Sequence, residues 1–163
     1  MSAAITTPLA DVPDETLAPV ITRRISDLET FRISDKDTNY FAMIADPVRD
    51  KVPFSIFLEI FEPGGKTPWH HHGYAHEMFY VLSGTGKSIC NGEEIAVKAG
   101  ESFIVRPGHD HEVINTGTEK LYCLTVMIPN EGFAELVRSG FRVPLTPDDV
   151  AVLTGKTLDQ AAF

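Results

Sequence analysis

The histidines of this chain are confined to one stretch, between residues 70 and 111. His70 and His72 are two positions apart, so on an extended chain both side chains project to one side and His71 projects to the other. Glu77 follows after a short loop, and His111 begins a later strand-like segment. Three imidazoles and one carboxylate from neighbouring strands suit a divalent metal such as Zn, Fe, Mn, Ni or Co. The spacing therefore predicts one metal ion bound by His70, His72, Glu77 and His111.

Other polar side chains near these four could move a proton or bind an anion. Tyr74, His76 and Tyr80 are candidate catalytic residues for proton transfer, and packing at the mouth of the site is the alternative for each. Arg106 and Lys87 are candidate substrate-binding residues that could hold a phosphate, and a solvated surface position is the alternative for both.

The remaining histidines are expected to lie outside the metal site. Strand alternation turns His71 away from its two neighbours. His76 is out of phase with Glu77, and His109 belongs to the turn at Pro107.

Short segments rich in aromatic and β-branched residues, separated by glycine and proline turns, must position these side chains. Asn91-Gly92 joins two such segments and is the strongest short signal for a hairpin. Short strands at regular spacing predict an all-β sandwich or barrel. From residue 54 onward, the expected strands are 54–61, 77–82, 87–90, 94–97, 102–105, 112–115 and 121–128.

The two ends of the chain differ from this central region. Prolines and acids interrupt residues 1–19, which we expect to form an irregular arm. Asn130 can cap a helix over 131–138, and Thr146-Pro147 can begin a second helix over 148–153. Strands are also expected at 20–25, 29–33 and 40–45. The predicted organisation is an arm (1–19), a barrel with N-terminal strands (20–129) and a helical tail (130–163).

The composition limits the classes of partner. The length of 163 residues is typical of one domain. A net charge of -9 and a pI of about 5.0 disfavour nucleic acid and anionic membranes as partners. Residues 1–19 lack the pattern of a secretory signal, and Cys90 and Cys123 form no CxxC pair, so we expect a cytoplasmic protein with reduced thiols.

The residues around the predicted ligands resemble the first sequence motif of the cupin superfamily. Gly64 is followed after five residues by His70, and then by His72, Glu77 and Gly84 at the spacing of that motif. Glycines in such positions allow tight turns. Every position of the motif is matched.

The second motif of the same superfamily is also present. Gly100, Gly108, His111 and Asn115 occupy its positions. Arg106 stands where the family has a proline. This departure changes no predicted ligand, and it places a cation beside the motif.

The resemblance covers about residues 54–129 and implies a double-stranded β-helix, the jelly-roll barrel, with the metal inside. The superfamily includes sugar-phosphate isomerases, dioxygenases, decarboxylases, lyases and non-catalytic binding domains, and the fold does not choose among them. We therefore predict a metal-dependent enzyme that acts on a sugar phosphate or on a keto or carboxylic acid. A non-catalytic binding or sensor domain and an Fe(II) dioxygenase are the alternatives.

Strand patterns also predict the packing and the assembly of the chain. Alternation places Phe79, Val81 and Val113 inside the barrel with the ligands. The apolar stretches within residues 20–50 and the open edges of a two-sheet barrel favour pairing with a second copy. We therefore expect a homodimer in which residues 20–50 contribute to the interface.

Overall fold

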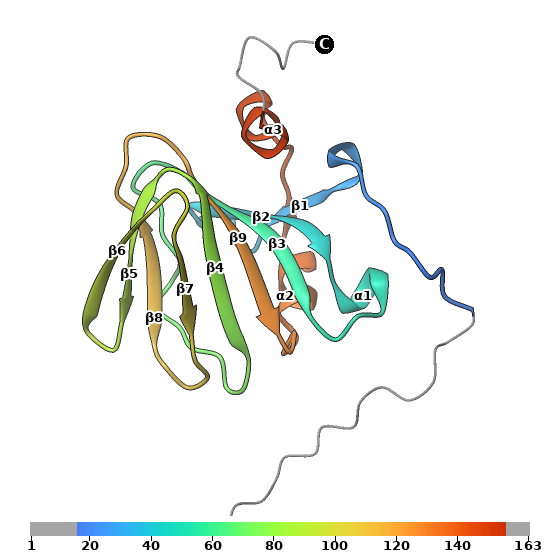
Figure 1. Ribbon diagram of the computed structural model, residues 1–163, viewed down its shortest axis with the longest axis horizontal. Helices are drawn as coiled ribbons and strands as arrows, with labels where there is room; N and C mark the ends of the chain where they lie inside the picture. Colours follow the sequence, from blue (N-terminus) through green and yellow to red (C-terminus); the bar gives the residue numbers. More distant parts are fainter. Residues whose placement is uncertain (1–15, 156–163) are drawn as a thin grey trace, which may run out of the picture.

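The computed structural model describes residues 16–155, and its strands form a jelly-roll barrel (Figure 1). Seven strands form one antiparallel sheet in the order β10-β1-β2-β3-β9-β4-β7, and three form a second sheet in the order β6-β5-β8. The parts of the predicted arm and tail at 1–15 and 156–163 lie outside the described residues. The predicted all-β barrel is confirmed.

Short strands follow one another along the chain, as the glycine and proline turns in the sequence predicted. The helices are a short 3₁₀ helix (Ile25–Asp27), α1 (Pro47–Asp50), α2 (Phe133–Arg138) and α3 (Pro147–Thr154). The strands are β1 (Glu29–Arg32), β2 (Asn39–Ala45), β3 (Ser55–Phe61), β4 (His76–Ser83), β5 (Thr85–Cys90), β6 (Glu93–Lys98), β7 (Ser102–Val105), β8 (His111–Asn115), β9 (Leu121–Ile128) and β10 (Phe141–Arg142).

Strand β4 shows how alternation fills the barrel. Glu77, Phe79 and Val81 point inward and are 3%, 1% and 0% exposed, whereas Tyr80 on the opposite face is 38% exposed. Val113 on β8 is also fully buried. The predicted inward positions of Phe79, Val81 and Val113 are confirmed, so apolar side chains continue from Glu77 along the inside of the barrel.

An aromatic cluster fills the barrel next to α2. Phe41 of β2 and Phe57 of β3 are both buried, and their ring centroids lie 5.3 Å apart. Phe133 of α2 packs on both, at centroid distances of 5.5 and 5.2 Å. Rings of this size dominate the free energy of core packing, so they fix α2 against the inner faces of β2 and β3.

The predicted strand at 20–25 is wrong. Residues 20–24 have no regular structure, and Val20 is 72% exposed. Strand β1 pairs with β2 on one side and with β10 on the other, so residues 20–25 find no free edge there. Arg23 holds this segment instead, through Ile44 O at 2.8 Å and the carboxylate of Asp50. The homodimer through residues 20–50 stays a prediction.

Helix α2 begins two residues later than the sequence predicted. Glu131 and Gly132 have φ angles of 52° and 78°, which no α-helix accepts. Asn130 still receives a hydrogen bond from the backbone N–H of Ala134, at 2.9 Å. The second predicted helix is confirmed as α3, with Thr146 as its N-cap and Gly155 as its C-cap.

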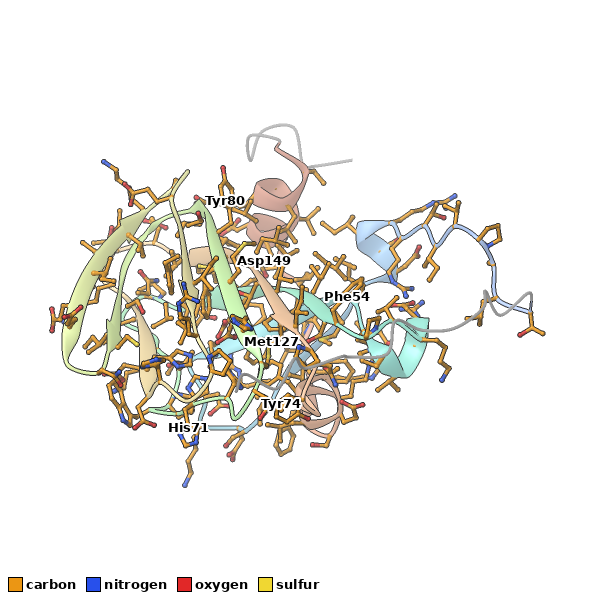
Figure 2. The ribbon with its side chains drawn as sticks, turned by 60° about the horizontal axis from the view of Figure 1, so that its bottom comes forward. Phe54, His71, Tyr74, Tyr80, Met127 and Asp149 are labelled. Atoms are coloured by element: carbon orange, nitrogen blue, oxygen red, sulfur yellow. The ribbon has the colours of Figure 1, made fainter. Side chains whose placement is uncertain are left out.

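A buried carboxylate ties α3 to the outer face of the larger sheet. Asp149 is 0% exposed and accepts hydrogen bonds from the hydroxyls of Tyr40 and Tyr122, at 2.8 and 2.9 Å. Lys120 Nζ, at 3.1 Å, and the backbone N–H of Thr146, at 2.7 Å, complete its partners. Figure 2 labels Asp149, which belongs to the first turn of α3. Burial raises the pKa of Asp149, but these hydrogen bonds outweigh burial and leave the pKa below its usual value.

We expect Asp149→Ala to lower the free energy of unfolding by about 3 kcal/mol, because two buried hydroxyls and an ammonium lose their acceptor. The folded pKa of Asp149 is lower than the unfolded one, so its stabilisation is complete above the unfolded pKa and is lost as pH falls through the folded pKa. Urea denaturation at a series of pH values measures both effects. Asp148→Ala, at the exposed neighbouring position, is the control. Equal stabilities of the two variants would contradict this role.

Candidate metal centre

Four side chains predicted as metal ligands converge at one end of the barrel. One potential ligand atom from each of His70, His72, Glu77 and His111 lies within 4.8 Å of the others. His70 and His111 are held together by two backbone hydrogen bonds, of 3.1 and 2.8 Å, which form an isolated β-bridge. His72 lies in no strand, so only the bridge at His70 gives this extended segment regular pairing. Both rings still face the cluster, with centroids 5.0 Å apart.

Backbone carbonyls set the tautomers of two imidazoles. His70 Nδ1 lies 2.9 Å from Pro68 O, and His111 Nδ1 lies 3.0 Å from His109 O. A carbonyl oxygen only accepts, so Nδ1 carries the proton in both neutral rings. Their Nε2 atoms therefore keep a free lone pair, which is the state that binds a metal.

Glu77 supplies the negative charge of the cluster. Its Oε2 lies 3.0 Å from His111 Nε2 and 3.2 Å from His72 Nε2. Burial raises the pKa of Glu77, but its contacts with His111 and His72 outweigh burial and set the pKa at about 2. Because Nε2 of neutral His111 has no proton, it and Glu77 Oε2 are two acceptors 3.0 Å apart, and a proton or a metal cation between them would relieve their repulsion.

The spacing of these atoms fits a metal ion. Two ligand atoms about 2.1 Å from one ion, at right angles to each other, lie about 3.0 Å apart. The separations of Glu77 Oε2 from His111 Nε2 and His72 Nε2 are 3.0 and 3.2 Å. Burial is the largest cause that lowers the pKa of His70, and it favours the neutral, metal-binding form of the ring.

Glu131 fixes the loop between His72 and Glu77. Its carboxylate accepts backbone hydrogen bonds from Gly73, Tyr74 and Ala75, at 2.7, 3.1 and 2.7 Å. Burial raises the pKa of Glu131, but these three hydrogen bonds outweigh burial and lower it. The sequence placed Glu131 in a helix, and no local pattern there indicated a contact with a loop more than fifty residues earlier.

A cavity of about 230 Å³ lies against His70 and Glu77. Apolar side chains from β2, from the segment that joins β1 to β2 and from α2 form much of its wall. Within residues 16–155, no lysine or arginine lines the cavity. The other lining residues are Ile33, Ser34, Asp37, Asn39, Phe41, Glu59, Thr67, Pro68, Phe133 and Leu136. The cavity can therefore hold a small organic ligand beside the cluster.

Glu59 is a second buried carboxyl group in this cavity. It is 1% exposed, and its Oε1 accepts a hydrogen bond from Asn39 Nδ2 at 2.7 Å. Burial, followed by the charge of Glu77, raises its pKa well above the usual value. Glu59 was not among the predicted site residues, although a single acid within the apolar segment 54–61 was a usable signal.

The candidate catalytic residues do not line this cavity. Tyr74 is 63% exposed and His76 is exposed. Tyr80 lies on the face of β4 opposite Glu77. Figure 2 shows Tyr74 at the lower edge of the molecule and Tyr80 near the opposite edge.

The candidate anion-binding residues and the remaining histidines also lie outside the cluster. Lys87 forms an ion pair with Glu94, at 2.9 Å, and Arg106 is exposed after β7. His71 Nδ1 contacts Asp110 at 2.9 Å, and His109 Nδ1 contacts Asn91 at 2.6 Å. The structure therefore brings together the four predicted ligands and places the other candidates elsewhere.

Comparison with known proteins identifies the barrel. Residues 57–127 match the family model described as the cupin domain. The chain contains a cupin domain. Beyond this match, a solved structure of a predicted oxalate decarboxylase from Thermotoga maritima superposes with a TM-score of 0.61 and 26% identity. That likeness covers 67% of this chain and 99% of the other.

Two curated relatives match within the cupin domain. The oxalate-binding protein of Thermotoga maritima is 35% identical over 66 residues, which are 40% of this chain and 54% of that protein. An uncharacterized protein of Methanocaldococcus jannaschii is 31% identical over 75 residues, covering 46% and 60%. The matches thus span little more than half the length of these relatives.

Among residues 16–155, none of the helices has the length and apolar character that a membrane span requires.

Proposed function

We propose that the cupin domain binds one divalent transition metal through His70, His72, Glu77 and His111, and that it holds a small keto or carboxylic acid there. The observation that carries this proposal is the convergence of His111 Nε2 and His72 Nε2 on one oxygen, Glu77 Oε2, at 3.0 and 3.2 Å. The donor set of imidazoles and one carboxylate suits Zn, Fe, Mn, Ni or Co.

The metal and the side chains of the protein would contribute different parts of the chemistry. A bound divalent ion would act as a Lewis acid toward a carbonyl or carboxylate oxygen. Three neutral histidines and one ionised glutamate leave the site with a net positive charge, which attracts an anion. Phe133 and Leu136 wall the cavity, exclude water and strengthen these electrostatic interactions.

The lining of the cavity favours an acid over a sugar phosphate. A phosphate anchor needs a cation or a set of backbone N–H groups, and the lining residues within 16–155 include Asp37 and Glu59 but no lysine or arginine. The relative from Thermotoga maritima named an oxalate-binding protein supports a carboxylate ligand. Binding without turnover is the second candidate function, because Tyr74, His76 and Tyr80 lie outside the cavity.

The test is calorimetric titration of the full chain, first stripped of metal and then loaded with each candidate ion. The ligands are oxalate, pyruvate, phenylpyruvate and fructose 6-phosphate. We expect at least one acid to bind about tenfold or more tightly than the sugar phosphate, and only in the presence of metal, because the metal supplies the anchoring charge. Binding of the acids without metal, or tighter binding of the sugar phosphate, would contradict the proposal. Product analysis after incubation separates turnover from binding.

A further inference from the structure

We propose that Glu59 is a ligand-binding residue of the cavity, whose carboxylic acid group donates a hydrogen bond to the acid held at the metal centre. This inference rests on the proposed function. It adds a second point of recognition to the site and selects for ligands with a hydrogen-bond acceptor facing Glu59.

The first support is the position of the side chain. Glu59 projects inward from β3 and lines the same cavity as His70 and Glu77. It is 1% exposed, and Asn39, which is 2% exposed, lines the cavity beside it. A ligand in contact with His70 and Glu77 therefore shares a space of about 230 Å³ with the Glu59 carboxyl group.

The second support is the hydrogen bonding of the two oxygens. Oε1 accepts from Asn39 Nδ2 at 2.7 Å, which assigns it the role of the carbonyl oxygen. Within residues 16–155, the other oxygen of Glu59 has no hydrogen-bond partner. Because Glu59 lines the cavity, this oxygen can meet the polar atom of a ligand that lies there.

The third support is the charge around Glu59. Phe41 of β2 and Cys123 of β9 lie opposite it in the sheet, and Glu77 of β4 faces the same cavity. No cation among the described residues pairs with Glu59. An ionised Glu59 would thus be a buried charge without a partner, which is costly whether or not a metal is bound to Glu77. The neutral form is favoured, and its O–H can donate.

Two substitutions separate hydrogen-bond donation from packing. Glu59→Gln keeps the arrangement, because its amide oxygen can accept from Asn39 while its N–H donates into the cavity. Glu59→Leu keeps the approximate volume and removes the donor. We expect Glu59→Gln to change ligand affinity by less than about threefold and Glu59→Leu to weaken it by about tenfold or more, because a hydrogen bond to a charged group is lost.

The measurement is calorimetric titration of Mn²⁺-loaded wild type and both variants with oxalate, pyruvate and phenylpyruvate. Metal content and thermal unfolding of each variant confirm that the site and the fold are intact. Equal affinity of Glu59→Leu and wild type would overturn the inference, as would equal weakening in both variants. If the wild type binds none of the acids, the proposed function fails and the inference fails with it, a result distinct from these two.

A second readout needs neither metal nor ligand. We expect the infrared spectrum of the metal-free wild type to contain the C=O stretch of a buried carboxylic acid, and the difference spectrum against Glu59→Gln to assign that band to Glu59. Absence of the band from the difference spectrum would overturn the inference, because an ionised carboxylate cannot donate a hydrogen bond.

Discussion

Replacing His111 with alanine is expected to weaken metal binding by about 100-fold or more, since even partners outside the ligand set commonly contribute 10–100-fold. His111 is 0% exposed, and its Nε2 lies 3.0 Å from Glu77 Oε2. Its loss would remove one of the four proposed ligand atoms and open space beside Glu77. Elemental analysis after dialysis against a weak chelator, followed by titration with Zn²⁺ and Mn²⁺, measures the effect.

His71→Ala is the matched control for that experiment. The His71 side chain is 58% exposed, pairs with Asp110 and lies outside the cluster, although it stands between two predicted ligands in the sequence. We expect this variant to retain the metal content of the wild type. Circular dichroism confirms folding of both variants. A folded His111→Ala protein with full metal content would exclude His111 as a ligand.

Arg138→Ala is expected to lower the free energy of unfolding by about 3–5 kcal/mol, because it leaves a buried carboxylate without its cation. Arg138 of α2 contacts Asp46 Oδ2 at 2.7 Å and Glu29 Oε2 at 2.6 Å. Asp46 is 1% exposed. Burial raises the pKa of Asp46, but hydrogen bonds from Arg138 and from backbone N–H groups outweigh burial and lower it. Urea denaturation at neutral pH measures the loss.

Arg142→Ala is the control for Arg138→Ala. Arg142 also contacts Glu29, but its side chain is 70% exposed, so we expect a loss of less than about 1 kcal/mol. Helix α2 also carries Phe133 and Leu136 into the cavity wall. Arg138→Ala should therefore weaken binding of the acid as well. Equal losses of unfolding free energy in the two variants would show that the size of the loss does not depend on the burial of Asp46.

Local patterns were sufficient to predict the barrel core. The two-residue alternation of β4 placed Glu77, Phe79 and Val81 on one face, and all three are buried. Asn91 and Gly92 have φ angles of 49° and 86°, as a tight hairpin turn between β5 and β6 requires. The convergence of His70, His72, Glu77 and His111 was likewise predicted from spacing, because short turns leave little freedom in how neighbouring strands meet.

Contacts between distant segments could not be predicted in this way. Residues 20–25 have the composition of a strand, but β10 occupies the edge where they could pair. The cavity wall combines Ile33 and Phe41 with Phe133 and Leu136, and no local pattern links residues so far apart. The contribution of Glu59 likewise depends on which side chains face it, which is a property of tertiary packing.

Diffraction at the absorption edge of the bound metal would locate the ion relative to the four proposed ligands. Crystals of the full chain, loaded with Zn²⁺ or Mn²⁺, should give one strong anomalous peak inside the barrel. We predict that this peak lies about 2.0–2.3 Å from one imidazole nitrogen each of His70, His72 and His111 and from a carboxylate oxygen of Glu77. A peak elsewhere, such as beside the exposed pair of His71 and Asp110, with none among these four side chains, would contradict the account.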